Sequence, residues 1–378
     1  MIGIRELARH LDISIGTVSR ALNGKADVNS VTRQRVLEAA AKLGYAPNQS
    51  GRSLRRGQTD LVGVIVPTGS QGALINSVFL SVLDGLRRKL LERRLDLAIF
   101  LHGEDEEIFG TLRGVTERGL VDGLIISNTL RVDPRIDYLL EKRKPFVAFG
   151  RSLSRSDHAW VDPDFEGAVE DAVDRLAALG HRHIALMLAS GETNYKYVIR
   201  DAYLDAMKRR GFEVAPDWLQ TRPAGESGGL EAGAALIAAN PRPTAVLVSD
   251  TRQTFGLYRA LHEAGIEVGR DISIIGLLPE TAAQILSPAL TTFQTDWTAI
   301  GSRLGEALIA EIARLSDAHA TEGPGQTVQC KTPTMLRPGD SVHRVATESG
   351  AARVSRRAGR DSTDESLSLS PRAGRGPR

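Results

Sequence analysis

The residues of this sequence best suited to chemistry are hydrogen-bond donors clustered between Ser14 and Asn23. Thr17, Ser19 and Arg20 fall within one short stretch, ISIGTVSRALNG, which contains no acidic residue. An Arg side chain can donate two hydrogen bonds to O6 and N7 of guanine, and hydroxyl groups bind phosphate oxygens or base edges. The pattern favours contact with nucleic acid, and a surface helix of a small bundle is the alternative explanation.

Three short helices are expected to position these donors. Apolar residues recur at helical spacing from Ile4 to Leu11, which predicts the first helix. Ser14 is expected to cap a second helix, whose inward-facing residues are Ile15, Val18 and Leu22. Ser30 is expected to cap a third helix that stops at Gly44. Its expected inward-facing residues are Val36, Leu37, Ala40 and Leu43.

Charge is distributed unevenly along the chain. Residues 1–58 contain ten Lys and Arg against four Asp and Glu, a net charge of +6. The whole chain carries only +2, so the remaining residues sum to −4. A basic head on a mildly acidic body is typical of a protein that meets a polyanion through the head alone. An unevenly charged solvated surface is the alternative.

From residue 59 onward, short apolar runs alternate with helical patterns in two successive series. This alternation predicts an α/β body of two lobes, each with a parallel sheet covered by helices on both faces. The first lobe is predicted to comprise about 59–157 plus 291–320, and the second about 158–290 plus 321–338. Ligands of such folds lie beyond the carboxyl ends of the strands, so a small-molecule site is expected between the lobes.

The remaining segments and the composition exclude several protein classes. Residues 47–58 are too short and polar to be helical alone, and the tail 339–378 is predicted to be disordered. The only cysteine, Cys330, rules out an internal disulfide or a Cys-rich zinc site. With no visible signal peptide and no membrane-length apolar run, we expect a cytoplasmic protein without membrane contact. We expect no cofactor and no metal site.

Two other functions are alternatives to DNA binding. An enzyme would need a P-loop or a Ser/His/Asp set in a recognisable motif, and neither is found in the sequence. A free-standing sugar-binding protein would match the two lobes. It would, however, require an export signal and no basic head, and the sequence shows the opposite.

The first 48 residues resemble the DNA-binding head of the lac repressor (LacI/GalR-type) family of bacterial transcription regulators. The match runs along IRELARHLDISIGTVSRALNGKADVNSVTRQRVLEAAAKLGYAPN and continues in RSLRRGQTDLVGVIVP, VDGLIIS and WVDPDFEGA. It then extends through LAALGHRHIALM, PTAVLVSD, DISIIG and LSPALTT. The resemblance implies a helix-turn-helix head at 1–46, a hinge at 47–58 and a periplasmic-binding-protein-like body at 59–338.

The resemblance also implies partners and residue roles. The expected partners are a pseudo-palindromic operator, a second copy of the chain and a small-molecule effector, expected to be a sugar; a tetramer stays open, and repression is the family default. By the resemblance, the base-reading residues are Ile15, Gly16 and Arg20. Supporting or backbone-contacting roles fall to Ser14, Thr17, Ser19, Asn23, Thr32 and Arg33. Leu54 matches the hinge residue that wedges into the minor groove, while Gly51 replaces the usual Ala and weakens the hinge helix.

The resemblance also assigns effector contacts to individual positions of this chain. Several of these positions depart from the family pattern. The residues implied to line the effector site are Phe79, Arg151, His158, Trp160, Asn194, Tyr195, Arg200 and Asp250. The usual clamping Arg aligns with Ile199, one residue before Arg200, and the usual Asp aligns with Thr251, one residue after Asp250. We therefore expect an effector that does not need the standard Arg/Asp clamp.

Overall fold

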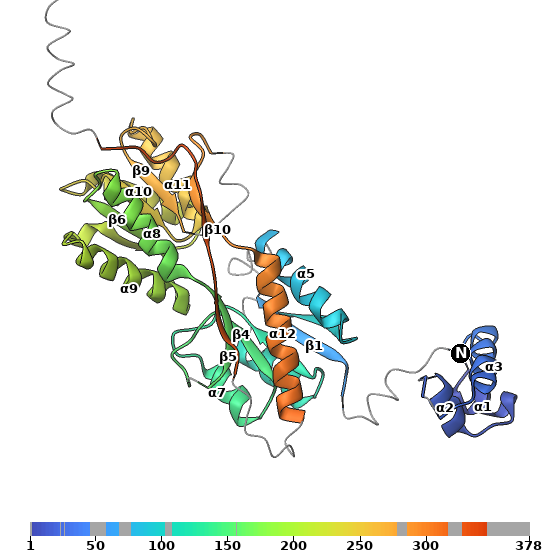
Figure 1. Cartoon of the computed structure of the whole chain (residues 1–378). Helices are drawn as coiled ribbons and strands as arrows, with labels where there is room; N and C mark the ends of the chain where they lie inside the picture. Colours follow the sequence, from blue (N-terminus) through green and yellow to red (C-terminus); the bar gives the residue numbers. More distant parts are fainter. Residues whose placement is uncertain are drawn as a thin grey trace, which may run out of the picture.

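The computed structural model describes residues 2–22, 24–25, 27–45, 58–67, 77–102, 108–155, 157–277, 286–316 and 327–345. The head consists of three helices, α1 (Ile4–Leu11), α2 (Ile15–Leu22) and α3 (Ser30–Lys42). Leu7, Val18 and Val36, one from each helix, are fully buried against one another and form the centre of a small apolar core. Figure 1 shows the head in blue.

The head differs from the sequence-based expectation in three details. Asn29 caps α3, since its side chain accepts a hydrogen bond from the Val31 amide at 2.8 Å, and Ser30 is the first helical residue. Ile15 and Leu37, both expected to face inward, are exposed on the surface. Helical spacing alone places a residue to within about a quarter turn, and Ala21 fills the core position instead of Ile15.

The first lobe of the body contains a six-stranded sheet in the order β11-β5-β4-β3-β1-β2. Its elements are β1 (Leu61–Pro67), α5 (Ser77–Leu91), β2 (Asp96–His102), α6 (Ile108–Glu117), β3 (Gly123–Ile126), α7 (Pro134–Glu141), β4 (Phe146–Phe149), β5 (Ala159–Pro163), α12 (Trp297–Ser316) and β11 (Gln329–Thr332). Residues of α5 and α12 pack in one apolar cluster against the sheet, and residues of α6 and α7 pack in another. All strand pairs of this sheet are parallel, which explains the continuous apolar runs in the sequence.

The second lobe repeats this arrangement with the strand order β12-β10-β9-β8-β6-β7. Its elements are α8 (Phe165–Ala178), β6 (Ile184–Ala189), α9 (Asn194–Arg209), β7 (Leu219–Arg222), α10 (Glu226–Ala238), β8 (Ala245–Val248), α11 (Thr251–Glu263), β9 (Ser273–Gly276), β10 (Thr291–Gln294) and β12 (Met335–Arg337). Helices α8 and α9 cover one face of the sheet, and α10 and α11 cover the other. The last strand, β12, runs antiparallel to β10. The predicted fold class of a three-helix head and a two-lobed body with parallel sheets is thus confirmed.

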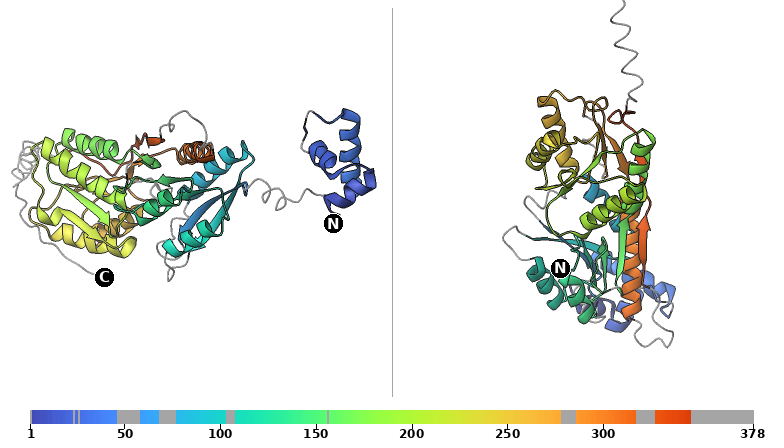
Figure 2. Two further views of the ribbon diagram at one scale, coloured as in Figure 1. Left: turned by 90° about the horizontal axis from the view of Figure 1, so that it is seen from below. Right: turned by 90° about the vertical axis from the view of Figure 1, so that its left-hand side faces the viewer.

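The chain crosses between the lobes three times, and the crossings lie elsewhere than the sequence suggested. Strand β5 pairs with β4 in the first lobe, so the first crossing follows Pro163 rather than residue 157. Strand β10 pairs with β9 in the second lobe, which places the second crossing just before α12. Strand β11 belongs to the first lobe and β12 to the second, so the third crossing lies at 333–334. The lobes lie end to end in perpendicular views of the molecule (Figures 1 and 2).

The beginning of the predicted tail is part of the second lobe. Ser341 is fully buried; its hydroxyl accepts a hydrogen bond from the Thr291 amide and donates one to the Ile274 carbonyl. The Val345 amide donates to the Leu179 carbonyl at 3.0 Å. The ordered body therefore extends to at least residue 345, and residues 346–378 lie outside the described residues.

Candidate DNA-binding and effector sites

The N-terminus of α2 is capped as the sequence predicted. The Ser14 hydroxyl accepts a hydrogen bond from the Thr17 amide at 3.0 Å and lies 2.9 Å from the Thr17 hydroxyl. The Ser14 side chain therefore satisfies a helix-end amide that would otherwise lack a partner. Val18, on the opposite face, is fully buried and fixes the rotation of the helix.

The three residues implied to read bases lie together on the outer face of α2. Ile15, Gly16 and Arg20 are all exposed. Ile15 offers an apolar surface of the kind that contacts a thymine methyl group, and Arg20 offers a charged fork. The Nε atom of Arg20 lies 3.4 Å from a carboxylate oxygen of Asp27, a neighbour that the sequence did not point to.

The residues with supporting roles in the head differ in their contacts and burial. Arg33 donates from Nη2 to the Lys25 carbonyl at 2.6 Å, so it braces the turn between α2 and α3. Thr32 and Ser19 are half-buried on α3 and α2. Asn23 and the hinge residue Leu54 lie outside the described residues, and their roles stay predictions.

A pocket of about 300 Å³ opens between the two lobes. The first lobe lines it with Arg131, Arg151, Ser152, Leu153, His158, Trp160 and Gln329, and the second with Asn194, Tyr197, Val198 and Asp201. Its volume is at the lower end of the range usual for small-molecule sites. Four of the eight residues predicted to contact an effector therefore meet here, namely Arg151, His158, Trp160 and Asn194.

Arg151 is the electrostatic centre of the first-lobe wall. Its Nε donates to Asp162 at 2.8 Å, while its two terminal nitrogens donate to the two oxygens of Glu166 at 2.7 and 2.8 Å. Lys331 adds a further ion pair to Glu166 at 2.8 Å. The guanidinium group also lies 5.5 Å from the Trp160 ring. Arg151 is thus held rigidly by two carboxylates at the wall of the pocket.

The two carboxylates respond differently to this environment. Burial raises the pKa of Asp162 to about 6, an effect that the adjacent guanidinium only partly offsets. Burial also disfavours ionised Glu166, but hydrogen bonds from Arg151 and Lys331 outweigh it and lower its pKa to about 2. Burial opposes the charge on Arg151 as well, yet its hydrogen bonds to Glu166 and Asp162 raise its pKa above the ordinary value.

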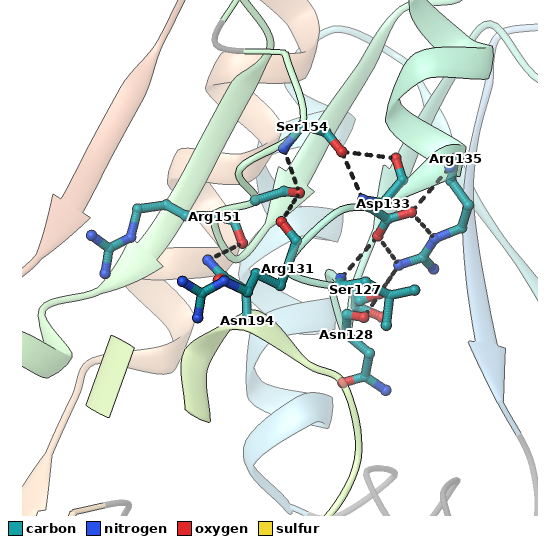
Figure 3. Close-up of polar contacts among 10 residues, drawn as sticks. Ser127, Asn128, Arg131, Asp133, Arg135, Arg151, Ser154 and Asn194 are labelled. Carbon is teal, nitrogen blue, oxygen red and sulfur yellow. Dashed lines mark hydrogen bonds and ion pairs between the residues drawn. The ribbon is translucent and has the colours of Figure 1, made fainter. Parts of the chain in front are cut away.

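The other predicted residues of the pocket are held by neighbouring groups. A ring nitrogen of His158 lies 2.6 Å from the Arg155 carbonyl, and the ring stacks on Phe146. Asn194 donates from its side chain to the Arg151 carbonyl and from its backbone to the Thr129 carbonyl, both at 2.8 Å. Asn194 therefore ties the two lobes together at the floor of the pocket (Figure 3).

Sequence reasoning missed the residues that join the lobes beside Asn194. Arg131, from the loop after β3, lies 4.6 Å from the centre of the Tyr197 ring and 3.9 Å from an oxygen of Asp201. Arg200 lies 5.1 Å from the centre of the same ring. Because Tyr197 and Asp201 are one turn apart on α9, they present a single surface to Arg131. The signal in the sequence was only that spacing, without any indication of the partner loop.

A buried ion pair supports this loop from within the first lobe. Asp133 and Arg135 are both buried, and their side chains meet through Nε and Nη2 of the arginine at 2.9 and 2.7 Å. Arg135 also donates to the carbonyls of Ser127 and Asn128, and the Asp133 amide donates to the Ser154 hydroxyl. Figure 3 shows how this network links the loops that follow β3 and β4. These loops carry Arg131 and Arg151 to the pocket.

The other four predicted effector residues are not brought to this pocket. Phe79 packs in the core of the first lobe, and Tyr195 packs beside Phe165 in the core of the second. Arg200 forms an ion pair with Asp201 at 2.7 Å. Asp250 caps α11 by accepting hydrogen bonds from the Arg252 and Gln253 amides. Their contact with an effector stays a prediction, since neighbouring segments 68–76 and 278–285 lie outside the described residues.

Comparison with known proteins gives consistent matches over nearly the whole chain. Residues 3–48 match the description "Bacterial regulatory proteins, lacI family", and residues 173–342 match "Periplasmic binding protein-like domain". The chain is 33% identical over 321 residues to the HTH-type transcriptional regulator AglR of Rhizobium meliloti, covering 84% of this chain and 89% of that protein. It is 31% identical over 353 residues to the HTH-type transcriptional regulator RafR of Escherichia coli, covering 90% and 99%.

Solved structures show the same architecture. The lac repressor dimer bound to operator and an anti-inducer superposes with a TM-score of 0.76 at 21% identity, over 90% of this chain and 99% of that one. A complex of the transcriptional regulator CelR with cellobiose gives 0.67 at 24% identity, over 90% and 100%. The matched proteins are regulators rather than enzymes, which agrees with the sequence-based expectation. With the helix-turn-helix geometry of the head, these matches place the chain in the lacI family of bacterial regulatory proteins, as a DNA-binding transcriptional regulator.

Proposed function

We propose that this regulator acts as a homodimeric repressor, whose affinity for a pseudo-palindromic operator is set by a sugar bound between its lobes. The observation that carries the proposal is the pocket formed by residues of both lobes. A ligand there contacts both lobes at once, so its binding energy depends on their relative position. Ligand and operator are then linked reciprocally, by a coupling that is typically about 1–3 kcal/mol.

The chemistry of the pocket supports a sugar as the effector. Its wall combines charged and amide groups, the hydroxyl of Ser152 and the rings of Trp160 and Tyr197. Hydroxyl groups of a sugar bind such charged and amide groups through directional hydrogen bonds. One structural relative is a complex with cellobiose, and another relative, 26% identical, is named a ribose operon repressor.

The surface of the first lobe supports the homodimer. Strand β2 lies at the edge of its sheet, and its side chains Ile99 and Leu101 are exposed. Leu80 is exposed on α5, which packs beside that strand. An open sheet edge with exposed apolar side chains is a surface that proteins normally cover. A second copy of the chain covers it in the proposed dimer, which brings two heads to the two halves of an operator.

The hinge completes the proposed mechanism. Leu54 is proposed to insert into the minor groove at the centre of the operator, where unstacking costs a few kcal/mol and is offset by contacts to bent DNA. The chain enters the body at Thr59 and Asp60, whose amides donate hydrogen bonds to the Asp122 carboxylate at 2.7 and 2.8 Å. This contact fixes the point at which lobe movement reaches the hinge.

The test begins with the DNA. The full-length protein is incubated with fragments of its own genome, the retained fragments are sequenced, and binding to the recovered operator is measured by gel shift. Arg20→Ala should abolish the preference for operator over scrambled DNA while weak general binding remains. Sedimentation should give a dimer, and Leu101→Asp should yield monomers that bind operator weakly.

The effector is tested on the same protein. Neutral mono- and disaccharides, including cellobiose, are screened by thermal shift, and operator binding is titrated with each sugar that binds. A binding sugar should weaken operator affinity by about five- to 150-fold, and Tyr197→Ala should abolish the shift without loss of operator binding. The repressor proposal fails if a tightly bound sugar leaves operator affinity unchanged, or if transcription from the operator falls when the gene is deleted.

A further inference from the structure

The Arg20 side chain lies between Asp27, in the turn that follows α2, and Gly16, in the first turn of α2 itself. On one side, its Nε lies 3.4 Å from Asp27, in the turn between α2 and α3. On the other side, its Nη1 lies 3.5 Å from the point that a Cβ atom on Gly16 would occupy. The guanidinium group therefore spans from Asp27 to Gly16 along the exposed face of α2.

Hydrogen bonds lie on both sides of Asp27 in the chain. Arg33 donates to the Lys25 carbonyl on one side of Asp27, and Asn29 caps α3 on the other. Lys25 also donates its amide to the Arg20 carbonyl at 3.1 Å. Asp27 therefore lies between two hydrogen-bonded residues, and its side chain is 61% exposed beside Arg20.

We propose that Asp27 is a positioning residue for Arg20 and thereby a determinant of operator specificity. This inference rests on the base-reading role proposed for Arg20. The carboxylate holds Nε and leaves the two terminal nitrogens, on the Gly16 side, to meet O6 and N7 of one guanine. Planar, two-pronged donation of this kind requires a fixed orientation, which a free Arg side chain on an exposed helix does not have.

The negative charge of Asp27 also increases discrimination between the operator and other DNA. A carboxylate beside the DNA backbone is repelled by phosphates, so it weakens binding to any sequence. At the operator this cost is offset because the oriented Arg20 gains its guanine contacts, whereas on other sequences it is not offset. Asp27 thus raises the ratio of operator affinity to non-specific affinity in two ways. It orients Arg20 at the operator, and it weakens binding to other sequences.

The experiment is a double-mutant cycle on the full-length protein, using the operator recovered from genomic DNA and a scrambled duplex of equal length. Asp27→Asn should raise affinity for the scrambled duplex and lower the operator-to-scrambled ratio at least fivefold. Its salt dependence on the scrambled duplex should steepen, by roughly 0.9 in the log–log slope for each phosphate that the released Arg20 contacts. In the Arg20→Ala background, Asp27→Asn should leave the ratio unchanged, because no oriented side chain remains.

Glu38→Gln is the matched control, since Glu38 is an exposed acid on α3 that bonds only locally to Gln34 and its change removes the same charge. Asp27→Ser provides a second variant, and circular dichroism confirms that the heads are folded. The proposal is overturned if Asp27→Asn and Glu38→Gln alter both duplexes equally. It is also overturned if Asp27→Asn reduces the ratio just as much without Arg20. If Arg20→Ala retains full discrimination, the base-reading role of Arg20 fails first, and the inference about Asp27 fails with it.

Discussion

The two lobes share one strand order, but the polar groups near the ends of their strands are arranged differently. Arg151 and Asp162 of the first lobe form a closely paired charge network with Glu166, at the start of α8 in the second lobe. At the start of α11 in the second lobe, Gln253 and Thr254 are fully buried beside the ion pair of Asp250 and Arg252. The comparison indicates that charged groups organise the Arg151 side of the pocket, whereas amide and hydroxyl groups lie buried at the start of α11.

The buried polar groups at the start of α11 are organised by a single amide. The Gln253 side chain donates to the carbonyls of Arg222 and Pro223 at 3.1 and 2.9 Å, which joins the end of β7 to α11. The hydroxyls of Ser249 and Thr254 have no hydrogen-bond partner among the described residues. A charge network and an amide network tolerate substitution differently, and this difference can be measured.

The largest effect is expected from Arg151→Met. The substitution leaves Asp162 and Glu166 without their guanidinium partner, and breaking a buried ion pair in this way costs about 3–5 kcal/mol. Urea unfolding monitored by circular dichroism measures the change. Arg200→Met in the second lobe is the matched control, because its pair with Asp201 is part-exposed and worth about 0–1 kcal/mol. Equal losses from the two variants would contradict the contrast between the lobes.

A pH dependence of intermediate size is expected from Asp162. Its pKa is about 6 in the folded protein and near 3.9 in an unfolded chain, so between these values the folded state binds more protons. Stability should therefore decrease as the pH rises from 4.5 to 6.5, by about 2 kcal/mol. Glu166 has the opposite sign but titrates below this window. Asp162→Asn should flatten the curve, and an unchanged curve would show that another group titrates.

A smaller effect is expected from Gln253→Leu in the second lobe. It removes the donor from three carbonyls, those of Leu188, Arg222 and Pro223, which costs about 1–3 kcal/mol, and it should have no pH dependence between 4.5 and 6.5. Hydrogen exchange should show faster opening of the β7–α11 region than in the wild type. A loss as large as that of Arg151→Met would remove the distinction between the two networks.

The smallest effect is expected from Thr254→Val. The change keeps the shape of the side chain and removes a buried hydroxyl without a partner among the described residues, so stability should change by less than about 1 kcal/mol. Thermal unfolding measures it, with Thr291→Val for comparison, since the Thr291 hydroxyl is hydrogen-bonded to the Gly339 carbonyl. If Thr254→Val is the more damaging of the two, the Thr254 hydroxyl has a partner and the start of α11 is more organised than proposed.

The sequence predicted the fold well because each buried parallel strand leaves a continuous apolar run. It did not predict the lobe boundaries, since membership of a sheet depends on pairing between distant segments. The stretch 159–163 looks like the start of a new series, but it pairs with β4. Helices α10 and α12 were not singled out either. The GGLEAGAAL run of α10 is mostly small residues, and its apolar face shows only where Gly229 and Gly256 let α10 and α11 touch backbone to backbone.

The candidate sites were predictable to different degrees. The cap by Ser14 and the exposed Arg20 follow from local pattern, because a helix of eight residues fixes both. Arg131 and Tyr197 could not be found in this way, since their contact depends on how one lobe meets the other. The role of Asp27 does not follow from the pattern of α2, because its carboxylate reaches Arg20 from the following turn.

The three crossings between the lobes have a mechanical consequence. The chain passes between the lobes side by side at 164, 295–296 and 333–334. Three such connections resist twisting and sliding of one lobe against the other more than a single linker does, but they bend easily in one direction. Bending about the three crossings is therefore the relative motion of the lobes that this connectivity favours. In the proposed mechanism, a molecule that closes the pocket moves Thr59 and Asp60, where the hinge begins, along the same path.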